Sequence, residues 1–284
     1  MLGAIYGLIG LGIVSIFKCT KVLNIAQGEM VMLGAFFCYF VLVQVHLPVW
    51  VAVLAGIGMA ALLGLLLQYL FQRRLIGQPI LTLLMMTILL VPFLRGWGSL
   101  IWGGLPVAYK PLIIPRGQIE LGNVALPYTY LWTFVAALAV FLLMFLAFKY
   151  TRIGITLRAV AEGHQTARAC GISVKKVFTL VWLISGMVAG VGGILLANYC
   201  GCHTLSLGGI GIIALPVVIL GGLESIGGAL VAGLIIGVTQ SMVGGYLDPL
   251  IGGGFAEAAP FVLMLIILWF KPYGLFGEVR IERL

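Results

Sequence analysis

The sequence predicts an all-α integral membrane protein of eight or nine transmembrane helices, forming a single domain over residues 1–284. Three observations predict this fold class: 62% of the residues are hydrophobic, only 8% are charged, and the mean hydropathy is +1.21. Soluble domains average about 45–50% apolar and about 25% charged residues. A membrane-spanning helix takes roughly 20 apolar residues, and the apolar stretches supply eight or nine such lengths. The composition therefore excludes soluble, disulfide-rich secreted and nucleic-acid-binding proteins.

Nine apolar runs define the expected helices, and segments with charged or turn-forming residues separate them. The runs fall at about 2–17, 27–46, 47–72, 80–94, 130–148, 177–198, 207–223, 226–245 and 255–270. The seventh run is interrupted by several glycines and a proline, namely Gly208, Gly209, Gly211, Pro216, Gly221 and Gly222. Irregular backbone at membrane depth is tolerated only where protein or a water-filled cavity covers it. We therefore expect either a broken span or a re-entrant segment near 207–223.

Basic residues predict the orientation, because cytoplasmic loops of membrane proteins carry an excess of Lys and Arg. Thirteen of the 16 basic residues fall on four connections, at 18–26, 73–79, 149–176 and 271–284. The other three fall in the segment 95–129, namely Arg95, Lys110 and Arg116. This distribution predicts a cytoplasmic loop at 149–176, a cytoplasmic tail at 271–284 and an outer loop at 95–129. The N-terminus would lie outside and the C-terminus inside.

Glycine is frequent in the apolar runs, with 40 residues in the chain. Three pairs form G-x-x-x-G motifs: Gly3 with Gly7, Gly186 with Gly190, and Gly233 with Gly237. Such small faces let helix backbones approach closely in lipid, where no hydrophobic force drives helices together. We interpret the three motifs as packing surfaces rather than ligand sites.

No set of catalytic residues is found in the sequence. It lacks the G-x-x-x-x-G-K-[ST] phosphate loop, so the chain itself is not expected to bind ATP. The five cysteines have no regular spacing, and the C-G-C-H run at 200–203 supplies at most three of the four ligands of a closed zinc site. We therefore expect neither an enzyme nor a metal site, and no cofactor on this chain.

Glu29 is the acidic residue within an apolar run that best fits a functional role. An acidic group at a helix centre costs ~2.5–3.5 kcal/mol on insertion scales and tends to be functional. Asn24 and Gln27 precede it with the spacing of a capping box, which places Glu29 in the first turns of the following helix. Two interpretations stay open. Glu29 either offsets the positive end of a helix dipole near the interface or lines a substrate path at a helix start.

The connection 149–176 has six basic residues and one acid, yet its pattern is not that of a plain linker. Between Arg158 and Cys170 there is no proline, Glu162 lies early, and Gly171 follows as a stop. This pattern is typical of a short helix that ends at a glycine. A short polar helix between two spans buries little of itself, so we expect it to contact a partner protein. The alternative is a basic loop that only sets orientation.

Four segments carry a family resemblance. They are N-I-A-Q-G-E-M-V-M-L-G-A (24–35), T-R-I-G-I-T-L-R-A-V-A (151–161) with A-R-A-C-G-I (167–172), V-I-L-G-G-L-E-S-I-G-G-A (218–229) and K-P-Y-G-L-F-G (271–277). Each segment alone is weak evidence, whereas the four together are highly specific. Over almost its whole length the chain resembles the branched-chain amino acid ABC transporter permeases of the LivH type.

The resemblance implies a permease subunit of a binding-protein-dependent importer in the bacterial inner membrane. The implied partners are a homologous LivM-like permease subunit, two cytoplasmic ATPase subunits that alone bind ATP, and a periplasmic solute-binding protein. The cytoplasmic helix would dock into an ATPase groove, and its coupling residues would be Arg152, Gly154, Arg158, Ala167 and Gly171. Branched-chain amino acids are the default cargo, while urea, short amides and aromatic acids stay open.

A permease fed by a binding protein needs no tight site of its own, so its path should be mostly apolar with a few polar groups. The candidate lining residues are Asn24, Gln27, Glu29, Met30, Thr82, Thr87, Gly209 and Pro216. The ammonium of an amino acid would meet Glu29, and its carboxylate would meet backbone N–H groups at a helix break. The alternative function is a stand-alone secondary transporter in which Glu29 couples ions. A membrane-embedded enzyme comes third, because no catalytic set supports it.

Overall fold

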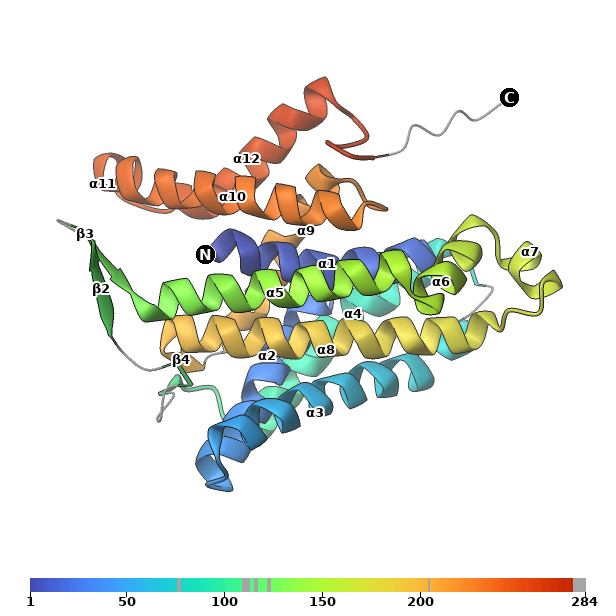
Figure 1. Cartoon of the computed structure of the whole chain (residues 1–284), viewed down its shortest axis with the longest axis horizontal. Helices are drawn as coiled ribbons and strands as arrows, with labels where there is room; N and C mark the ends of the chain where they lie inside the picture. The colour runs from blue at the N-terminus through green and yellow to red at the C-terminus, as the bar shows by residue number, and fades with distance from the viewer. Residues whose placement is uncertain (76–77, 109–112, 115–116, 122–123, 204, 278–284) are drawn as a thin grey trace.

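The computed structural model describes the chain except for residues 76–77, 109–112, 115–116, 122–123, 204 and 278–284 (Figure 1). Within these described residues the fold is a bundle of apolar helices, which confirms the predicted all-α membrane class. Seven helical stretches are long and apolar enough to cross a membrane: Leu2–Thr20, Gln27–Gln44, Val49–Leu75, Ile80–Trp102, Tyr128–Tyr150, Val174–Cys200 and Ile226–Leu250. Two shorter apolar stretches, Leu205–Gly221 and Phe255–Phe270, follow the predicted seventh and ninth runs. The total of eight or nine spans stays a prediction.

The elements follow the predicted runs closely along the chain. The long helices are α1 (Leu2–Thr20), α2 (Gln27–Tyr39, continued by the π-helix Phe40–Gln44), α3 (Val49–Leu70, followed by the 3-10 turn Gln72–Leu75), α4 (Ile80–Trp102), α5 (Tyr128–Tyr150), α8 (Val174–Cys200) and α10 (Ile226–Tyr246). The shorter helices are α6 (Arg152–Glu162), α7 (His164–Ala169), α9 (Ile210–Gly221, preceded by the 3-10 turn Leu205–Gly209), α11 (Asp248–Ile251) and α12 (Phe255–Phe270).

The connection that the sequence predicts to lie outside begins later than expected and contains strands. The sequence predicts an outer loop from residue 95, but α4 continues to Trp102, and Arg95 within this helix forms an ion pair with the buried Glu29. Beyond α4, β2 (Gln118–Leu121) and β3 (Val124–Pro127) form an antiparallel hairpin. The short strand β1 (Val107–Ala108) pairs with β4 (Cys202–His203). The backbone after α8 is therefore tied to the backbone after α4.

Helix α1 is the centre of the bundle, and nearly all of its residues are buried. The predicted glycine motifs form the contacts between helices. A Cβ atom on Gly3 would lie 2.6 Å from the Gly233 carbonyl oxygen of α10, and a Cβ on Gly186 would lie 2.5 Å from the Ala60 carbonyl oxygen of α3. Side chains larger than glycine would push these backbones apart. The interpretation of the motifs as packing surfaces is confirmed.

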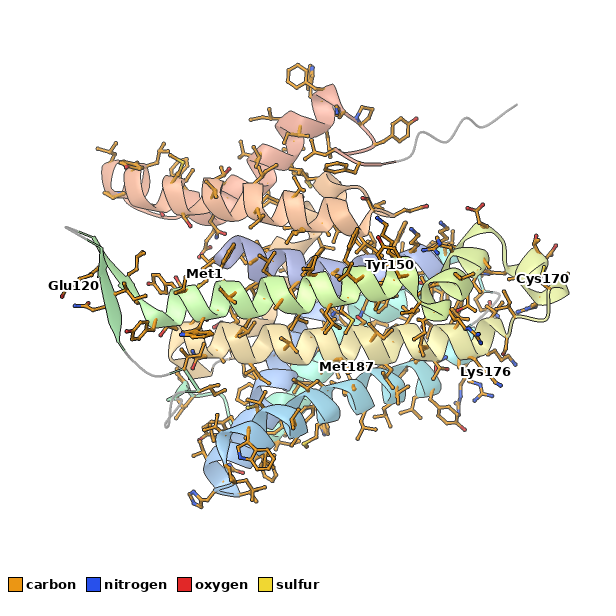
Figure 2. The ribbon with its side chains drawn as sticks, in the orientation of Figure 1. Met1, Glu120, Tyr150, Cys170, Lys176 and Met187 are labelled. Carbon is orange, nitrogen blue, oxygen red and sulfur yellow. The ribbon has the colours of Figure 1, made fainter. Side chains whose placement is uncertain are left out.

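The basic connections gather at one end of the bundle (Figure 1). Three interactions hold them there: the His164 ring with the Cys19 carbonyl at 3.0 Å, Lys21 with Glu224 at 2.8 Å, and the Leu275 amide with the Leu220 carbonyl at 2.7 Å. Cys170 and Lys176 lie at this end, whereas Met1 and Glu120 lie toward the opposite end (Figure 2). The side chains of Lys110, Arg116, Arg280 and Arg283 lie outside the described residues.

Two helices begin inside the bundle instead of at its ends. The Gln27 side chain, in the first turn of α2, donates to the Ser185 carbonyl, and a Cβ on Gly12 would meet this same side chain. Gly12 and Ser185 lie near the middle of α1 and α8, so residues 21–26 run back into the bundle before α2 begins. The start of α9 packs against the start of α2, because a Cβ on Gly211 would lie 2.8 Å from the Gly28 backbone. The predicted break in the seventh run is thus a helix that starts within the protein.

Candidate functional site

The buried charge at the start of α2 is the carboxylate of Glu29. Its Oε1 accepts a hydrogen bond from Nη2 of Arg95 on α4, and the N–O distance is 2.6 Å. The Glu29 side chain is 2% exposed and that of Arg95 is 45% exposed. A carboxylate removed from water needs a partner of opposite charge, because the desolvation penalty amounts to several kcal/mol per ion. Arg95 supplies this partner, and its outer part stays accessible.

The start of α9 closes around the same carboxylate. A Cβ atom on Gly208 would lie 2.5 Å from Oε1 of Glu29, so a larger residue here would displace the carboxylate from its present position. A Cβ on Gly28 would lie 2.5 Å from the Gly211 amide nitrogen. The first turns of α2 and α9 therefore meet beside Glu29, and the positive ends of both helix dipoles favour its negative charge. Among the described residues, Oε2 of Glu29 has no hydrogen-bond partner.

A second polar cluster lies just before Glu29 in the chain. Gln27 Oε1 accepts hydrogen bonds from Asn24 Nδ2 at 3.1 Å and from Ser185 Oγ at 2.8 Å. Asn24 Nδ2 also lies 3.6 Å from the sulfur of Met30. The predicted capping box is wrong, because Asn24 binds the Gln27 side chain and no side chain caps α2. The cluster joins three predicted path residues in one buried network.

The remaining predicted path residues are divided. Thr87 is buried and donates to the Leu23 carbonyl at 3.1 Å, so it contacts the segment that leads into α2. Gly209 is the residue before α9, and Pro216 is buried nearly two turns beyond the start of that helix. Thr82 is exposed on another face of α4, in a groove that Phe71 and Phe93 also line. The structure thus separates Thr82 from the other seven candidates.

The predicted coupling segment is two helices, not one. Helix α6 starts at Arg152 and ends before Gly163, and α7 ends at Ala169 with Gly171 at φ +78° as the predicted stop. A longer helix is prevented because the chain turns at Gly163 to return α7 to the bundle. Arg152 and Gly171 are exposed.

Three of the predicted coupling residues contact their own chain. Gly154 packs against the Phe148 carbonyl, and Nη1 of Arg158 donates to that carbonyl at 2.9 Å. Ala167 is 2% exposed and belongs to the hydrophobic core. Gly154 and Ala167 both face inward, and their role in coupling stays a prediction. The exposed residues of α7 are its four polar residues and Ala169, and Cys170 directly after the helix is exposed as well.

Arg95, Ser185 and Gly208 complete the site and were missed in the sequence. The charge of Arg95 predicts a loop residue, although the run 80–94 is short for a span. Continuing the helix to Trp102 gives 23 residues, a full crossing, so the length was the signal. Ser185 carries no such signal, because hydroxyl residues are common in membrane helices. Gly208 is visible in the sequence as a break in the run, but its contact with Glu29 is a tertiary feature.

No three of the described His, Cys, Asp and Glu side chains lie close enough to hold a metal ion. The side chains of Cys202 and His203, in the C-G-C-H run, lie outside the described residues.

Comparison with known families agrees with this geometry. The family model for the branched-chain amino acid transport system / permease component matches residues 1–270. The chain belongs to this family. The match covers all seven long helices and both shorter apolar ones, so the permease architecture extends over nearly the whole chain.

Two permeases are similar to this chain over almost their full length, and a third is similar over about half of it. The permease is 27% identical to the high-affinity branched-chain amino acid permease LivH of Salmonella typhimurium, over 99% of this chain and 94% of LivH. It is 26% identical to BraD of Pseudomonas aeruginosa, over 99% and 94% of the two chains. Over 52% of this chain it is 34% identical to the nucleoside ABC transporter permease NupC of Lactococcus lactis. No solved structure matches the chain. The protein is a multi-pass permease subunit of an ABC importer, a class that works with ATPase and binding-protein partners.

Proposed function

We propose that this permease conducts branched-chain amino acids into the bacterial cell along a path that passes the Glu29–Arg95 pair. It pairs with a homologous LivM-like permease subunit in the inner membrane. Two cytoplasmic ATPases drive it and alone bind ATP, and a periplasmic binding protein delivers the cargo. The observation that carries this proposal is the ion pair itself, which lies where the starts of α2 and α9 meet.

The charges of the pair suit an amino acid zwitterion. Arg95 is 45% exposed and offers its guanidinium to a carboxylate, while Oε2 of Glu29, which no described residue binds, accepts from an ammonium group. Both interactions are strengthened by the low dielectric of the surroundings. The helices that carry Glu29 and Arg95 also carry buried apolar residues, such as Met30 on α2 and Leu94 on α4. These residues suit the aliphatic side chain of the cargo. A neutral cargo such as urea would leave these charges unused.

The exposed face of α4 indicates where the path runs. Arginine facing lipid at a helix centre costs ~2.5–3.5 kcal/mol on insertion scales, so a half-exposed guanidinium is not expected to face lipid. Arg95 lies well inside the 23-residue helix α4 and is flanked by exposed Leu100, Phe93 and Trp97. We infer that this face meets the second permease subunit and that the path lies between the two.

The test of this function is uptake by cells that express the complete transporter. We expect labelled leucine to enter, uptake to stop on ATP depletion, and a protonophore at constant ATP to have no effect. Excess unlabelled valine should compete. Guanosine is tested because the chain is similar over about half its length to the nucleoside permease NupC. Competition by guanosine in place of valine would assign a nucleoside cargo. Inhibition by the protonophore at constant ATP would instead favour an ion-coupled transporter.

Coupling to the ATPases is expected through the exposed surface of α7. Arg168→Glu should lower ATPase recovery in a pull-down several-fold, because it reverses a charge at the exposed end of the helix, while the melting temperature stays unchanged. Ala167→Trp is the matched comparison: its side chain is buried, so it should lower the melting temperature. Full ATPase recovery and uptake with Arg168→Glu would remove this coupling assignment.

The orientation is tested by cysteine labelling on a background that lacks native thiols. Position 116 should react from outside, and positions 74, 168 and 280 from inside, because the basic connections lie at one end of the bundle. Positions 116 and 280 lie outside the described residues. Labelling of position 280 from outside would mean an even number of crossings, with 207–223 re-entrant.

A further inference from the structure

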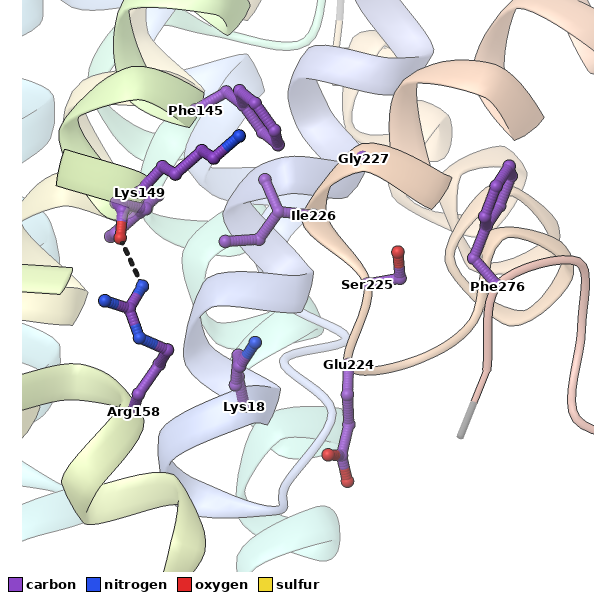
Figure 3. Close-up of a pocket in the computed structure, with 10 residues that line it drawn as sticks. Lys18, Phe145, Lys149, Arg158, Glu224, Ser225, Ile226, Gly227 and Phe276 are labelled. Atoms are coloured by element: carbon purple, nitrogen blue, oxygen red, sulfur yellow. Dashed lines mark hydrogen bonds between the residues drawn. The ribbon is translucent and has the colours of Figure 1, made fainter. Parts of the chain in front are cut away.

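A basic pocket lies at the end of the bundle that carries the basic connections (Figure 3). Its volume is about 290 Å³, and four helices meet around it: α1, α5, α6 and α10. Three cationic side chains line it, each from a different helix: Lys18, Lys149 and Arg158. The transport path described above does not include this pocket.

The described residues that line the pocket carry more positive than negative charge. Among the described residues that line it, Glu224 is the acidic one, and its Oε1 forms an ion pair with Lys21 at 2.8 Å. Figure 3 shows the Glu224 carboxylate turned away from the two lysines. The start of α10 adds further positive character, with Ser225 accepting from the Gly228 amide at 3.0 Å. Three cations around one concave surface repel one another unless an anion lies between them.

The walls of the pocket are apolar and aromatic, which distinguishes it from a site for a free inorganic ion. Phe145, Phe148, Ile226 and Phe276 border it. Next to Phe145, α5 carries the exposed side chains of Leu142, Leu143 and Leu146. Lys18 and Lys149 lie in the last turns of α1 and α5, where a span reaches the headgroup region. An anionic headgroup with acyl chains attached matches this combination of charge and apolar surface.

We propose that this pocket binds the headgroup of an anionic phospholipid of the inner leaflet. Its phosphate lies between Lys18, Lys149 and Arg158, and its acyl chains run along the exposed leucines of α5. Basic pockets between helices on the cytoplasmic side are suited to such headgroups. The lipid then joins α1, α5 and α10 to α6, the helix that Arg158 anchors to the Phe148 carbonyl. Its occupancy stabilises the position of the segment that faces the ATPases.

The experiment compares lipid binding to the purified permease by native mass spectrometry and by melting temperature. Phosphatidylglycerol should bind and raise the melting temperature, whereas phosphatidylcholine should do neither. The double variant Lys18→Gln/Lys149→Gln should bind phosphatidylglycerol roughly 30-fold more weakly, since each lysine near an anionic headgroup contributes to affinity. The matched control Lys175→Gln/Lys176→Gln removes the same charge at the same end, from residues that do not line the pocket, and should bind like the unmodified protein.

Three outcomes would overturn the proposal. Equal binding by the Lys18/Lys149 variant would place the lipid elsewhere, and equal weakening in the Lys175/Lys176 control would reduce the effect to net charge. An equal rise in melting temperature with millimolar inorganic phosphate alone would assign a soluble anion. If the double variant is unstable, the single variants Lys18→Gln and Lys149→Gln replace it, and each should weaken binding. Leucine uptake does not enter this test, so its result is independent of the cargo.

Discussion

Arg95→Gln is expected to abolish leucine uptake and to destabilise the permease, with a larger effect than Glu29→Gln. Removing the guanidinium leaves the Glu29 carboxylate 2% exposed and without its partner. Breaking a buried ion pair from one side costs ~3–5 kcal/mol, because the remaining charge is left uncompensated. We expect a clear fall in melting temperature and little transporter in the membrane. The measurements are thermal unfolding of the purified subunit and leucine uptake normalised to assembled protein.

Glu29→Gln is the milder change of the pair, because Arg95 is 45% exposed and can be solvated. We expect an order-of-magnitude loss of uptake, about 1.4 kcal/mol, with normal recovery of the ATPases. The double variant Glu29→Gln/Arg95→Gln removes both charges, so it should regain stability relative to Arg95→Gln without regaining uptake. The coupling between the two changes then measures the ion pair.

Wild-type uptake by an assembled Glu29→Gln transporter would contradict the substrate role. Glu29 would then be only a charge at a helix start, and a cargo without an ammonium group would be favoured. The double variant could also prove no more stable than Arg95→Gln. The stability lost in Arg95→Gln would then have a cause other than the unpaired carboxylate.

Gly28→Ala is expected to destabilise the permease by ~1–3 kcal/mol and to remove most of its uptake, although it adds a single methyl group. A Cβ at this position would lie 2.5 Å from the Gly211 amide nitrogen and closer still to the Gly208 carbonyl. Gly208 belongs to the turn before α9 and Gly211 to the first turn of that helix, so neither backbone atom moves without displacing the helix start. Overpacking of this kind costs ~1–3 kcal/mol. The displaced turn also contacts Glu29, which is why uptake should fall together with stability.

Gly58→Ala is the matched control within the same chain. Gly58 lies in the middle of α3, and a Cβ there would meet nothing within 4 Å. Alanine in a helix interior is favoured over glycine by roughly 0.5–1 kcal/mol, so this variant should be as stable as the original or slightly more so. Thermal unfolding and leucine uptake of the two variants are compared side by side. Equal behaviour of Gly28→Ala and Gly58→Ala would show that the crossing of α2 and α9 tolerates added volume.

The sequence left open whether Glu29 offsets a helix dipole near the membrane interface or lines a substrate path at a helix start. The structure combines parts of both interpretations. Glu29 does lie in the first turn of α2, as the helix-dipole interpretation required. However, α2 begins beside Gly12 and Ser185, well inside the bundle, so Glu29 is not an interfacial residue. A charge at that position cannot reach water at a helix end by extending its side chain. It is stabilised instead by Arg95 and by two helix starts.

The sequence by itself determined the class of the protein and the positions of its helices. Apolar runs mark the helices because each span must satisfy its own backbone hydrogen bonds in lipid, a local requirement that leaves a local signal. The G-x-x-x-G motifs predicted close helix contacts, and Gly171 predicted a helix end, for the same reason. In both cases the residue type alone indicates the local structure, because glycine permits close backbone approach and a positive φ. Asn24, Gln27, Glu29 and Thr87 were recognisable as unusual because polar groups are costly inside an apolar run.

Only the tertiary structure decided which of these groups meet. Arg95 lies 66 residues from Glu29, and nothing local distinguishes an arginine that ends a span from one that continues it to reach a buried acid. Helix packing also decides three other features. They are the continuation of α4 beyond Arg95, the return of residues 21–26 into the bundle, and the separation of Thr82 from Thr87. The division of the coupling helix at Gly163 has the same origin, because α7 buries Ala167 against the core. Packing between distant segments sets these features, since the energy of a buried charge or a close glycine contact depends on its neighbours in space.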